Sequence, residues 1–159
     1  MSSTRTMGIS VTDVDTAAVL PLGFEYHQPA GSDDLGPKVW IYVYNDDASS
    51  FVQGTIVARD GTTTTYDGII APVDAPTARI MGVAQHTIVA GSYGFIQKKG
   101  IAEVLADTGG VTADNALVVG NAVAGRADNV GAVTTAAFGY TTESVAATAL
   151  ATCWINCPG

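Results

Sequence analysis

Short runs of β-branched and aromatic residues, separated by turn-forming residues, dominate this chain. No stretch keeps the i, i+3, i+4, i+7 spacing of apolar residues through three helical turns, so we expect little α-helix. The pattern predicts an all-β fold, a small antiparallel β-barrel or sandwich. The predicted strands are Val39–Tyr44, Phe51–Ala58, Arg79–Val89, Tyr93–Lys99, Ile101–Ala106, Ala116–Gly120, Ala136–Thr142 and Ala149–Asn156.

Clusters of Gly, Asp, Asn and Ser lie between most of these runs. Each cluster supplies a residue that tolerates positive φ or whose side chain can cap a turn. The chain therefore has turn signals at short intervals, as small β-barrels do. The main turn signals are Asn45-Asp46-Asp47, Asp60-Gly61, Ala90-Gly91-Ser92, Thr108-Gly109-Gly110 and Asp114-Asn115.

The run VWIYVY, residues 39 to 44, predicts a strand that is apolar on both faces. In a strand, alternate side chains point to opposite faces, so valine and isoleucine lie on one face while Trp40, Tyr42 and Tyr44 lie on the other. Such a strand is either covered on both sides within its own domain or lends one face to a partner. Both interpretations remain open, because tyrosine and tryptophan suit interfaces as well as cores.

The first 38 residues differ from the rest. The stretch LPLGFEYHQPAGSDDLGPK holds three of the six prolines and shows no sustained periodicity. We therefore predict an extended N-terminal arm over residues 1–38 and a β-barrel domain over residues 39–159. The arm is either a loosely ordered tail or a segment that becomes ordered on a neighbouring subunit, and we expect it to contribute to docking more than to folding.

Composition favours a protein that associates with others. Hydrophobic residues make up 47% of the chain and charged residues only 14%, against about 25% charged in an average soluble domain. A surface so poor in charge predicts an oligomer, because a monomer relies on charge for solubility. The net charge is −8, so nucleic acid is an unexpected partner. The basic residues are scattered apart from one adjacent pair: Arg5, Lys38, Arg59, Arg79, Lys98, Lys99 and Arg126.

Membrane insertion and secretion are not expected from this sequence. No window approaches the roughly 20 apolar residues that span a bilayer. The N-terminal MSSTRTMGIS lacks the continuous apolar segment of a secretory signal. We therefore expect no membrane partner and synthesis in the cytoplasm.

Cysteine and histidine give no catalytic or metal-binding motif. If ATCWINC is a strand, the Cα atoms of Cys153 and Cys157 lie about 13 Å apart, too far for a disulfide. We interpret both as small buried residues with free thiols. The histidines, His27 and His86, have no paired spacing and no cysteine nearby, so they predict neither a metal set nor a nucleophilic triad.

The acidic residues are also uninformative about chemistry. Glu25, Glu103 and Glu143 are far apart in sequence, which gives no support for a paired-carboxylate glycosidase. The aspartate pairs lack the spaced loop of a calcium site and are interpreted as solvated turn residues. We expect no enzyme activity and no catalytic, cofactor or metal site. The aspartate pairs in question are Asp13/Asp15, Asp33/Asp34 and Asp46/Asp47.

Several segments between Ile80 and Cys157 resemble head decoration (cement) proteins of tailed bacteriophages, especially the small β-barrel type of marine and cyanobacterial phages. The segments are MGVAQHTIVAGSYGFIQKKG (81 to 100), AEVLADTGGVTADNALVV (102 to 119), FGYTTES (138 to 144) and ATCWINC (151 to 157), with a looser likeness in KVWIYVYNDDASSFVQGTIV (38 to 57). These segments resemble the barrel strands of that family. Thr141 and Thr142 depart from it, because more apolar residues are expected there.

The resemblance implies a virion protein that binds the major capsid protein. It implies a homotrimer on the outer capsid surface that holds neighbouring capsomers together against the pressure of packaged DNA. One alternative is another β-rich virion component, such as a tail, fibre or vertex protein, because fold alone does not fix function. A second is a carbohydrate-binding module that stacks sugars on Trp40, Tyr42 and Tyr44.

Overall fold

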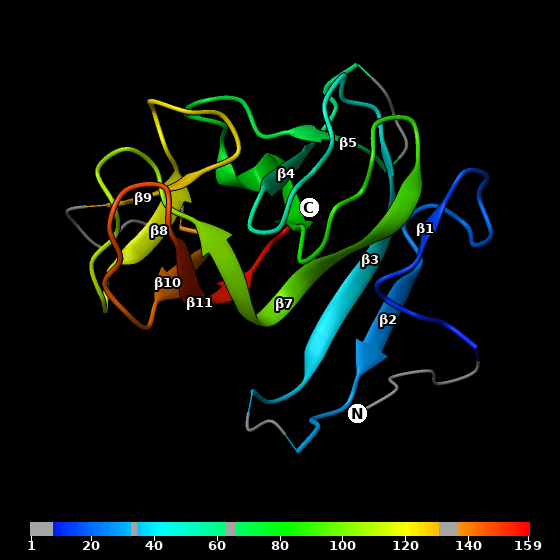
Figure 1. Cartoon of the computed structure of the whole chain (residues 1–159), viewed down its shortest axis with the longest axis horizontal. Helices are drawn as coiled ribbons and strands as arrows, with labels where there is room; N and C mark the ends of the chain where they lie inside the picture. Colours follow the sequence, from blue (N-terminus) through cyan, green and yellow to red (C-terminus); the bar gives the residue numbers. More distant parts are fainter. Residues whose placement is uncertain (1–7, 33–34, 63–65, 131–136) are drawn as a thin grey trace.

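The computed structural model describes residues 8–32, 35–62, 66–130 and 137–159 and is all-β, as predicted (Figure 1). The part of the chain described contains one short 3-10 turn, Thr77–Arg79, and no helix long and apolar enough to cross a bilayer. Its strands are β1 (Val14–Asp15), β2 (Glu25–Gln28), β3 (Lys38–Asn45), β4 (Ile56–Arg59), β5 (Asp67–Ile70), β6 (Ile80–Val83), β7 (Tyr93–Leu105), β8 (Ala116–Val119), β9 (Ala127–Asn129), β10 (Gly139–Thr141) and β11 (Leu150–Asn156).

Five strands close into a barrel. They follow the order β3, β5, β4, β6 and β7, and β7 pairs back onto β3. All neighbours in this ring are antiparallel except β3 and β5, which are parallel. Closure leaves these strands without free edges, so the barrel is a self-contained frame from which the remaining strands extend.

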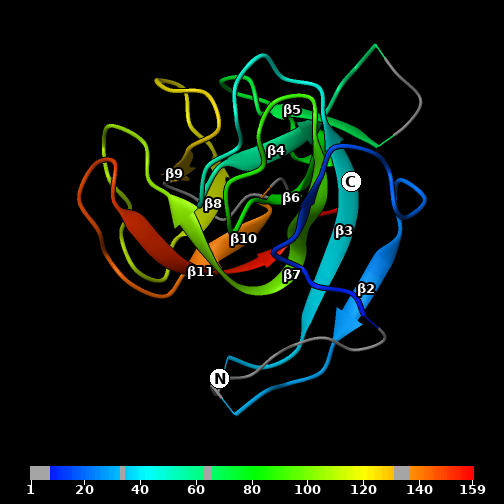
Figure 2. The same cartoon turned by 45° about the vertical axis from the view of Figure 1, so that its right-hand side comes forward.

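Strand β7 belongs to two parts of the sheet. Its first half pairs with β3, and its second half pairs with β11, beyond which lie β10, β8 and β9. The prediction of two strands, Tyr93–Lys99 and Ile101–Ala106, is therefore wrong: the chain runs as one strand through Gly100. Figures 1 and 2 show β7 curving from the barrel into this outer sheet.

Two apolar clusters fill the two sides of the curled sheet. In β4, Val57 points into the barrel interior, while its neighbours Ile56 and Ala58 point to the outer cluster. This alternation is what a strand buried on both faces requires. The barrel interior holds Ile41, Val43, Phe51, Val57, Met81, Ala84, Ile88 and Ile96. The outer cluster includes Leu117, Val119, Phe138, Ala151, Cys153, Ile155 and Cys157.

A third cluster lies under the N-terminal segment. Val11 and Tyr26 pack with Trp40, Tyr42 and Phe95. Strand β2 pairs with β3, and β1 pairs with β7. The expectation that no strand precedes Val39 is therefore wrong, because β1 and β2 add to the barrel strands (Figures 1 and 2). The same segment packs on the aromatic side chains of β3. Whether residues 39–159 form a domain without this segment stays a prediction.

Strand boundaries differ from the predicted ones where the chain turns. Gly54 has a φ of 86°, so the predicted strand Phe51–Ala58 is broken, and only its second part forms β4. Of the predicted strand Arg79–Val89, only Ile80–Val83 forms a strand, β6. Ile88, later in the same run, makes an isolated bridge to Phe51. Strands β5 and β9 were not predicted. Residue 136 of the predicted strand Ala136–Thr142 lies outside the described residues.

Turn residues and threonine hydroxyls hold the loops in place. Gly91, Gly110 and Asp114 have positive φ, as their turn signals predict. Thr141 is fully buried, and its hydroxyl donates to the carbonyl oxygen of Thr112 at 2.6 Å, which satisfies this polar group inside the core. The Thr142 hydroxyl donates to the carbonyl oxygen of Thr152 in the same way.

Asp107 anchors the loop before β9. Its carboxylate accepts hydrogen bonds from the backbone N–H groups of Thr108, Ala122 and Val123 at 2.8 to 3.4 Å. Burial favours the neutral carboxyl, but these backbone donors outweigh it and lower the pKa of Asp107. A Cβ on Gly120 would lie 2.2 Å from the Asp107 carboxylate, so only glycine fits beside it.

Candidate functional site

A groove of about 740 Å³ opens below the barrel, between the β2–β3 pair and the end of β11. Its charged wall consists of Lys38 from β3 and Lys98 and Lys99 from β7. Its apolar part consists of Val39, Ile101 and Trp154 together with Leu35, which is 40% exposed. We call this feature the lysine groove.

The lysine groove brings together all three lysines of the chain. Lys38 is far in sequence from the adjacent Lys98 and Lys99, since it starts β3 while the other two lie in the middle of β7. The basic residues are scattered in sequence apart from the Lys98–Lys99 pair, and the fold brings Lys38 to that pair. In a protein with a net charge of −8, this is a local concentration of positive charge.

A β-bulge explains how two consecutive lysines reach one groove. Neighbouring residues of a regular strand point to opposite faces. Here Val39 pairs with Lys99 and Trp40 pairs with Gln97, which leaves Lys98 as the extra residue of a bulge in β7. A bulge bends its strand and redirects the side chains beside it, so both lysines line the groove.

Glycine lets β7 approach β3 at the base of the groove. Gly100 has a φ of 106°, in the region that favours glycine. A Cβ there would lie 2.7 Å from the carbonyl oxygen of Pro37. The close approach holds the start of β3, with Lys38, against the middle of β7.

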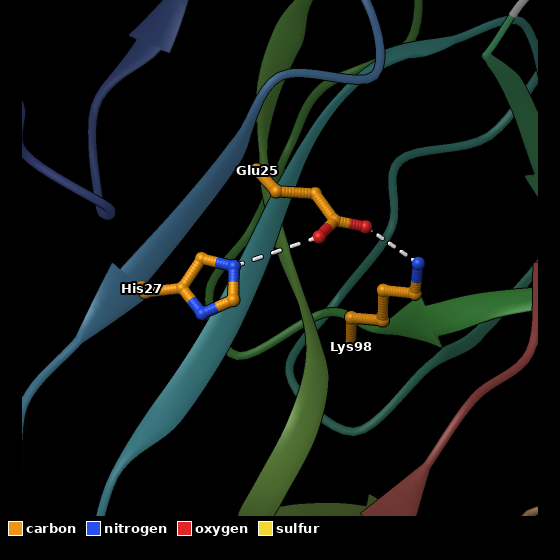
Figure 3. Close-up of polar contacts among 3 residues, drawn as sticks. All are labelled: Glu25, His27 and Lys98. Atoms are coloured by element: carbon orange, nitrogen blue, oxygen red, sulfur yellow. Dashed lines mark hydrogen bonds and ion pairs between the residues drawn. The ribbon is translucent and has the colours of Figure 1, made fainter.

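Glu25 neutralises one lysine (Figure 3). Its carboxylate lies 2.6 Å from the Nζ of Lys98 and 3.7 Å from the Nε2 of His27. Glu25 and His27 share one face of β2 because they are two residues apart. Lys38 and Lys99 make no ion pair with any residue that the structure describes, and Lys99 is exposed.

The apolar part of the groove continues the inside of the barrel. Val39 lies on the same face of β3 as Ile41 and Val43, which are buried in the barrel interior. Trp154 of β11 is half-buried, and its ring stacks on that of Tyr140 with 5.8 Å between centroids. The groove therefore offers ammonium groups beside apolar surface, a combination that suits a carboxylate flanked by apolar side chains.

The cysteines are buried, as predicted, and both thiols are free. Burial raises the pKa of the Cys153 and Cys157 thiols to about 12. Because the thiolate is the reactive and metal-binding form, neither cysteine is a nucleophile near neutral pH. The described residues contain no group of three His, Cys, Asp or Glu side chains placed to hold a metal ion.

The histidines lie in different environments. His27 is exposed at the lysine groove. His86 is partly buried, and burial lowers its pKa. The two ring nitrogens of His86 have no hydrogen-bond partner among the described residues, so no carboxylate orients this ring as it would in a catalytic triad.

Two glutamates that are distant in sequence meet at one residue. Glu103 accepts a hydrogen bond from the Thr152 hydroxyl at 3.1 Å, and Glu143 accepts one from the Thr152 backbone N–H at 2.7 Å. These Thr152 donors lower the pKa of Glu143. Through Thr152 of β11, the two carboxylates link β7 to the segment before β11.

One carboxylate of each described aspartate pair anchors a turn or a strand. Asp15 accepts a hydrogen bond from the Tyr42 hydroxyl, and Asp47 accepts bonds from the backbone N–H groups of Ser49 and Ile70. Each of these carboxylates is thus engaged within the fold. Asp33 and Asp34 lie outside the described residues.

The aromatic face of β3 is covered within the chain. Trp40 is 5% exposed and Tyr42 is 1% exposed, beneath the N-terminal segment. The indole N–H of Trp40 donates to the side chain of Gln28 at 2.7 Å. Trp40 and Tyr42 therefore follow the interpretation of interior burial and offer no open platform to a sugar. Tyr44, the third residue of that suggested platform, is partly exposed, and its ring packs against Tyr93 with 4.9 Å between centroids.

Comparison with known proteins supports the fold. The sequence matches no protein-family model, and no curated protein matches it significantly. Among solved structures, the head fiber gp8.5 N base of bacteriophage phi29 is similar, with a TM-score of 0.54 and 17% sequence identity. The match covers 74% of this chain and 94% of the phage protein.

Proposed function

We propose that this chain is a non-enzymatic structural protein of a tailed-bacteriophage virion. It binds the major capsid protein on the outer surface of the head, as a trimer, and stabilises contacts between capsomers. The observation that carries the proposal is the likeness to the phi29 head fiber base, which extends over 94% of that protein. The resemblance of residues 80–157 to head decoration proteins points to the same part of the particle.

Composition supports self-association. Only 14% of the residues are charged, and the described surface exposes large apolar residues such as Val19 (65%), Val52 (47%) and Val89 (48%). Scattered exposed valines are normal for a monomer. In combination with so few charges, they suit a surface that other subunits cover.

A second function, the base of a head fibre, is favoured by the same structural neighbour. Both functions place the chain on the outside of the head, and they differ in number of copies. A decoration protein occupies sites across the shell, in hundreds of copies, whereas a fibre base is present in a few dozen copies or fewer.

The test uses purified virions of the phage that encodes the chain. Quantitative mass spectrometry of the particles gives the ratio of this protein to the major capsid protein, and electron cryomicroscopy gives its position. We expect density for the barrel on the outer surface of the head. Particles that lack the protein, or that carry it only on the tail, would refute the proposal.

A binding experiment separates attachment from copurification. Purified protein is added to heads that lack it, and cosedimentation is measured together with the resistance of the heads to heat. The decoration function predicts saturable binding and a higher temperature of DNA release. The fibre function predicts binding at few sites with no change in that temperature.

A further inference from the structure

The lysine groove is a positive, concave surface on an otherwise acidic protein. Its charged side chains are all three lysines of the chain and one glutamate, Glu25; His27 also lines it. Because the whole chain has a net charge of −8, the surface outside the groove is more acidic than the chain as a whole. Another copy of this chain therefore presents negative charge that can pair with the positive charge of the groove.

The chain also exposes a segment with the right combination of side chains. Asp13 and Val14 are exposed neighbours, and Val19, in the same segment, is the most exposed large apolar residue of the described chain at 65%. The exposed Asp13 carboxylate beside valines matches a groove that places Lys38 and Lys99 next to Ile101 and Trp154. Leu35, at the rim, would be covered by the same contact.

We propose that the lysine groove receives an acidic, valine-containing surface segment of a second copy of this chain. The two contacting surfaces differ, so the interface is heterologous and joins copies head to tail. A heterologous contact either closes into a ring or continues as an open chain, and three copies in a ring give the trimer of the proposed function, on which this inference rests for the number of copies.

The groove is a poor site for a polyanion such as DNA. A row of phosphates would meet the Glu25 carboxylate inside the groove. The apolar part of the groove would also lie against a charged backbone. A protein segment with one or two carboxylates avoids both costs.

The test compares two variants with equal net charge. Lys38→Gln with Lys99→Gln removes two positive charges from the groove. The matched control, Ala124→Glu with Ala147→Glu, adds two negative charges at exposed positions in loops of the outer sheet, away from both the groove and the Asp13–Val19 segment. A third variant, Lys38→Arg with Lys99→Arg, keeps the charge of the groove. Circular dichroism and thermal melting establish that each variant is folded, and Lys99→Gln alone replaces the double variant if that does not fold.

Oligomer formation is measured by sedimentation equilibrium and light scattering at tens of micromolar protein, between 0.05 and about 1 M salt, where the Debye length falls to about 3 Å. We expect the glutamine variant to dissociate at least tenfold more readily than the wild type, with a weaker dependence on salt. The arginine variant and the matched control should assemble like the wild type.

Equal assembly of the glutamine variant and the wild type would overturn this inference and leave the proposed trimer intact. A wild-type protein that is monomeric throughout would overturn the trimer and this inference together. If the glutamine substitutions leave self-association unchanged but abolish binding to phage heads, the groove holds a segment of the capsid protein, and a second copy is the wrong occupant.

Discussion

The hydroxyl of Tyr42 tests whether the N-terminal segment is part of the folded core. It donates a hydrogen bond of 2.9 Å to Asp15, which links β3 to the segment that covers it. Tyr42→Phe removes this bond and keeps the ring in the aromatic cluster. A bond to a charged group contributes about 1.5 to 3 kcal/mol. Since Asp15 is partly exposed and water can replace the hydroxyl, we expect a loss of about 1 kcal/mol in the free energy of unfolding, or about 2 to 4 °C in melting temperature.

The same variant predicts a specific dependence on alkaline pH. Burial, followed by the hydrogen bond and charge of Asp15, raises the pKa of Tyr42 from 10.0 to about 12. The folded state thus holds this proton more tightly than the unfolded state. The resulting stabilisation is complete below pH 10 and is lost as the pH rises through 12. Two pKa units correspond to at most about 2.7 kcal/mol, which solvent screening at the partly exposed Asp15 reduces to about 1 kcal/mol.

Urea unfolding of wild type and Tyr42→Phe between pH 7 and 12 measures both effects. The difference in free energy of unfolding between the two proteins should be about 1 kcal/mol at neutral pH. It should narrow above pH 10, because Tyr42 ionises only in the wild type. The other groups are common to both proteins, so their effects cancel in the difference. Tyr140→Phe is the matched control, since its hydroxyl is on a ring that is 45% exposed. If Tyr42→Phe behaves like Tyr140→Phe at every pH, the contact between β3 and the N-terminal segment is not formed in solution.

Three further predictions concern the core. Asp107→Asn replaces the carboxylate that anchors the loop before β9 by a neutral amide, so it should lower the free energy of unfolding by about 1 kcal/mol near neutral pH. Because the pKa of Asp107 is lowered in the folded protein, this loss should shrink as pH falls below about 4, as measured by urea titration. Cys153 and Cys157 should stay unlabelled by a thiol reagent in the native protein and react after unfolding, and labelling of the folded protein at pH 8 would contradict their burial. Deleting residues 1–28 should lower the free energy of unfolding by about 3 kcal/mol or more, because Val11 and Tyr26 no longer cover the aromatic face; an unchanged melting temperature would instead support a separate arm.

The sequence predicts the central strand well because its two apolar faces alternate without interruption. Residues 39 to 44 are strand β3, and their two faces divide between the barrel interior and the aromatic cluster. Burial on both sides is what a strand shared by two packed layers requires. The sequence shows that the aromatic face of this strand must be covered. It does not show whether the same chain or a partner covers it, because the alternation of apolar residues is the same in both cases.

The continuity of β7 is not visible in the sequence. Glycine usually weakens a strand, so Gly100 is read as a boundary. In the structure the glycine is needed within the strand, because the backbone of Pro37 approaches it closely. The bulge at Lys98 depends on the same tertiary contact between β7 and β3. The lysine groove, which these two features build, could therefore be found only from the fold, although the adjacent Lys98 and Lys99 mark its position.

The N-terminal segment shows where periodicity stops being informative. Its strands have two and four residues, too short for alternation to separate them from loops. Pro21, Pro29 and Pro37 surround β2 and favour an extended backbone, which sequence analysis interprets as an arm. An extended segment with spaced aromatic residues is also what pairs with an existing strand, since its partner supplies the hydrogen bonds and the apolar surface. The composition that predicts a detached arm is therefore equally suited to a segment that covers its own barrel. The apolar face of β3 is what distinguishes these two possibilities, because without the N-terminal segment that face would be uncovered.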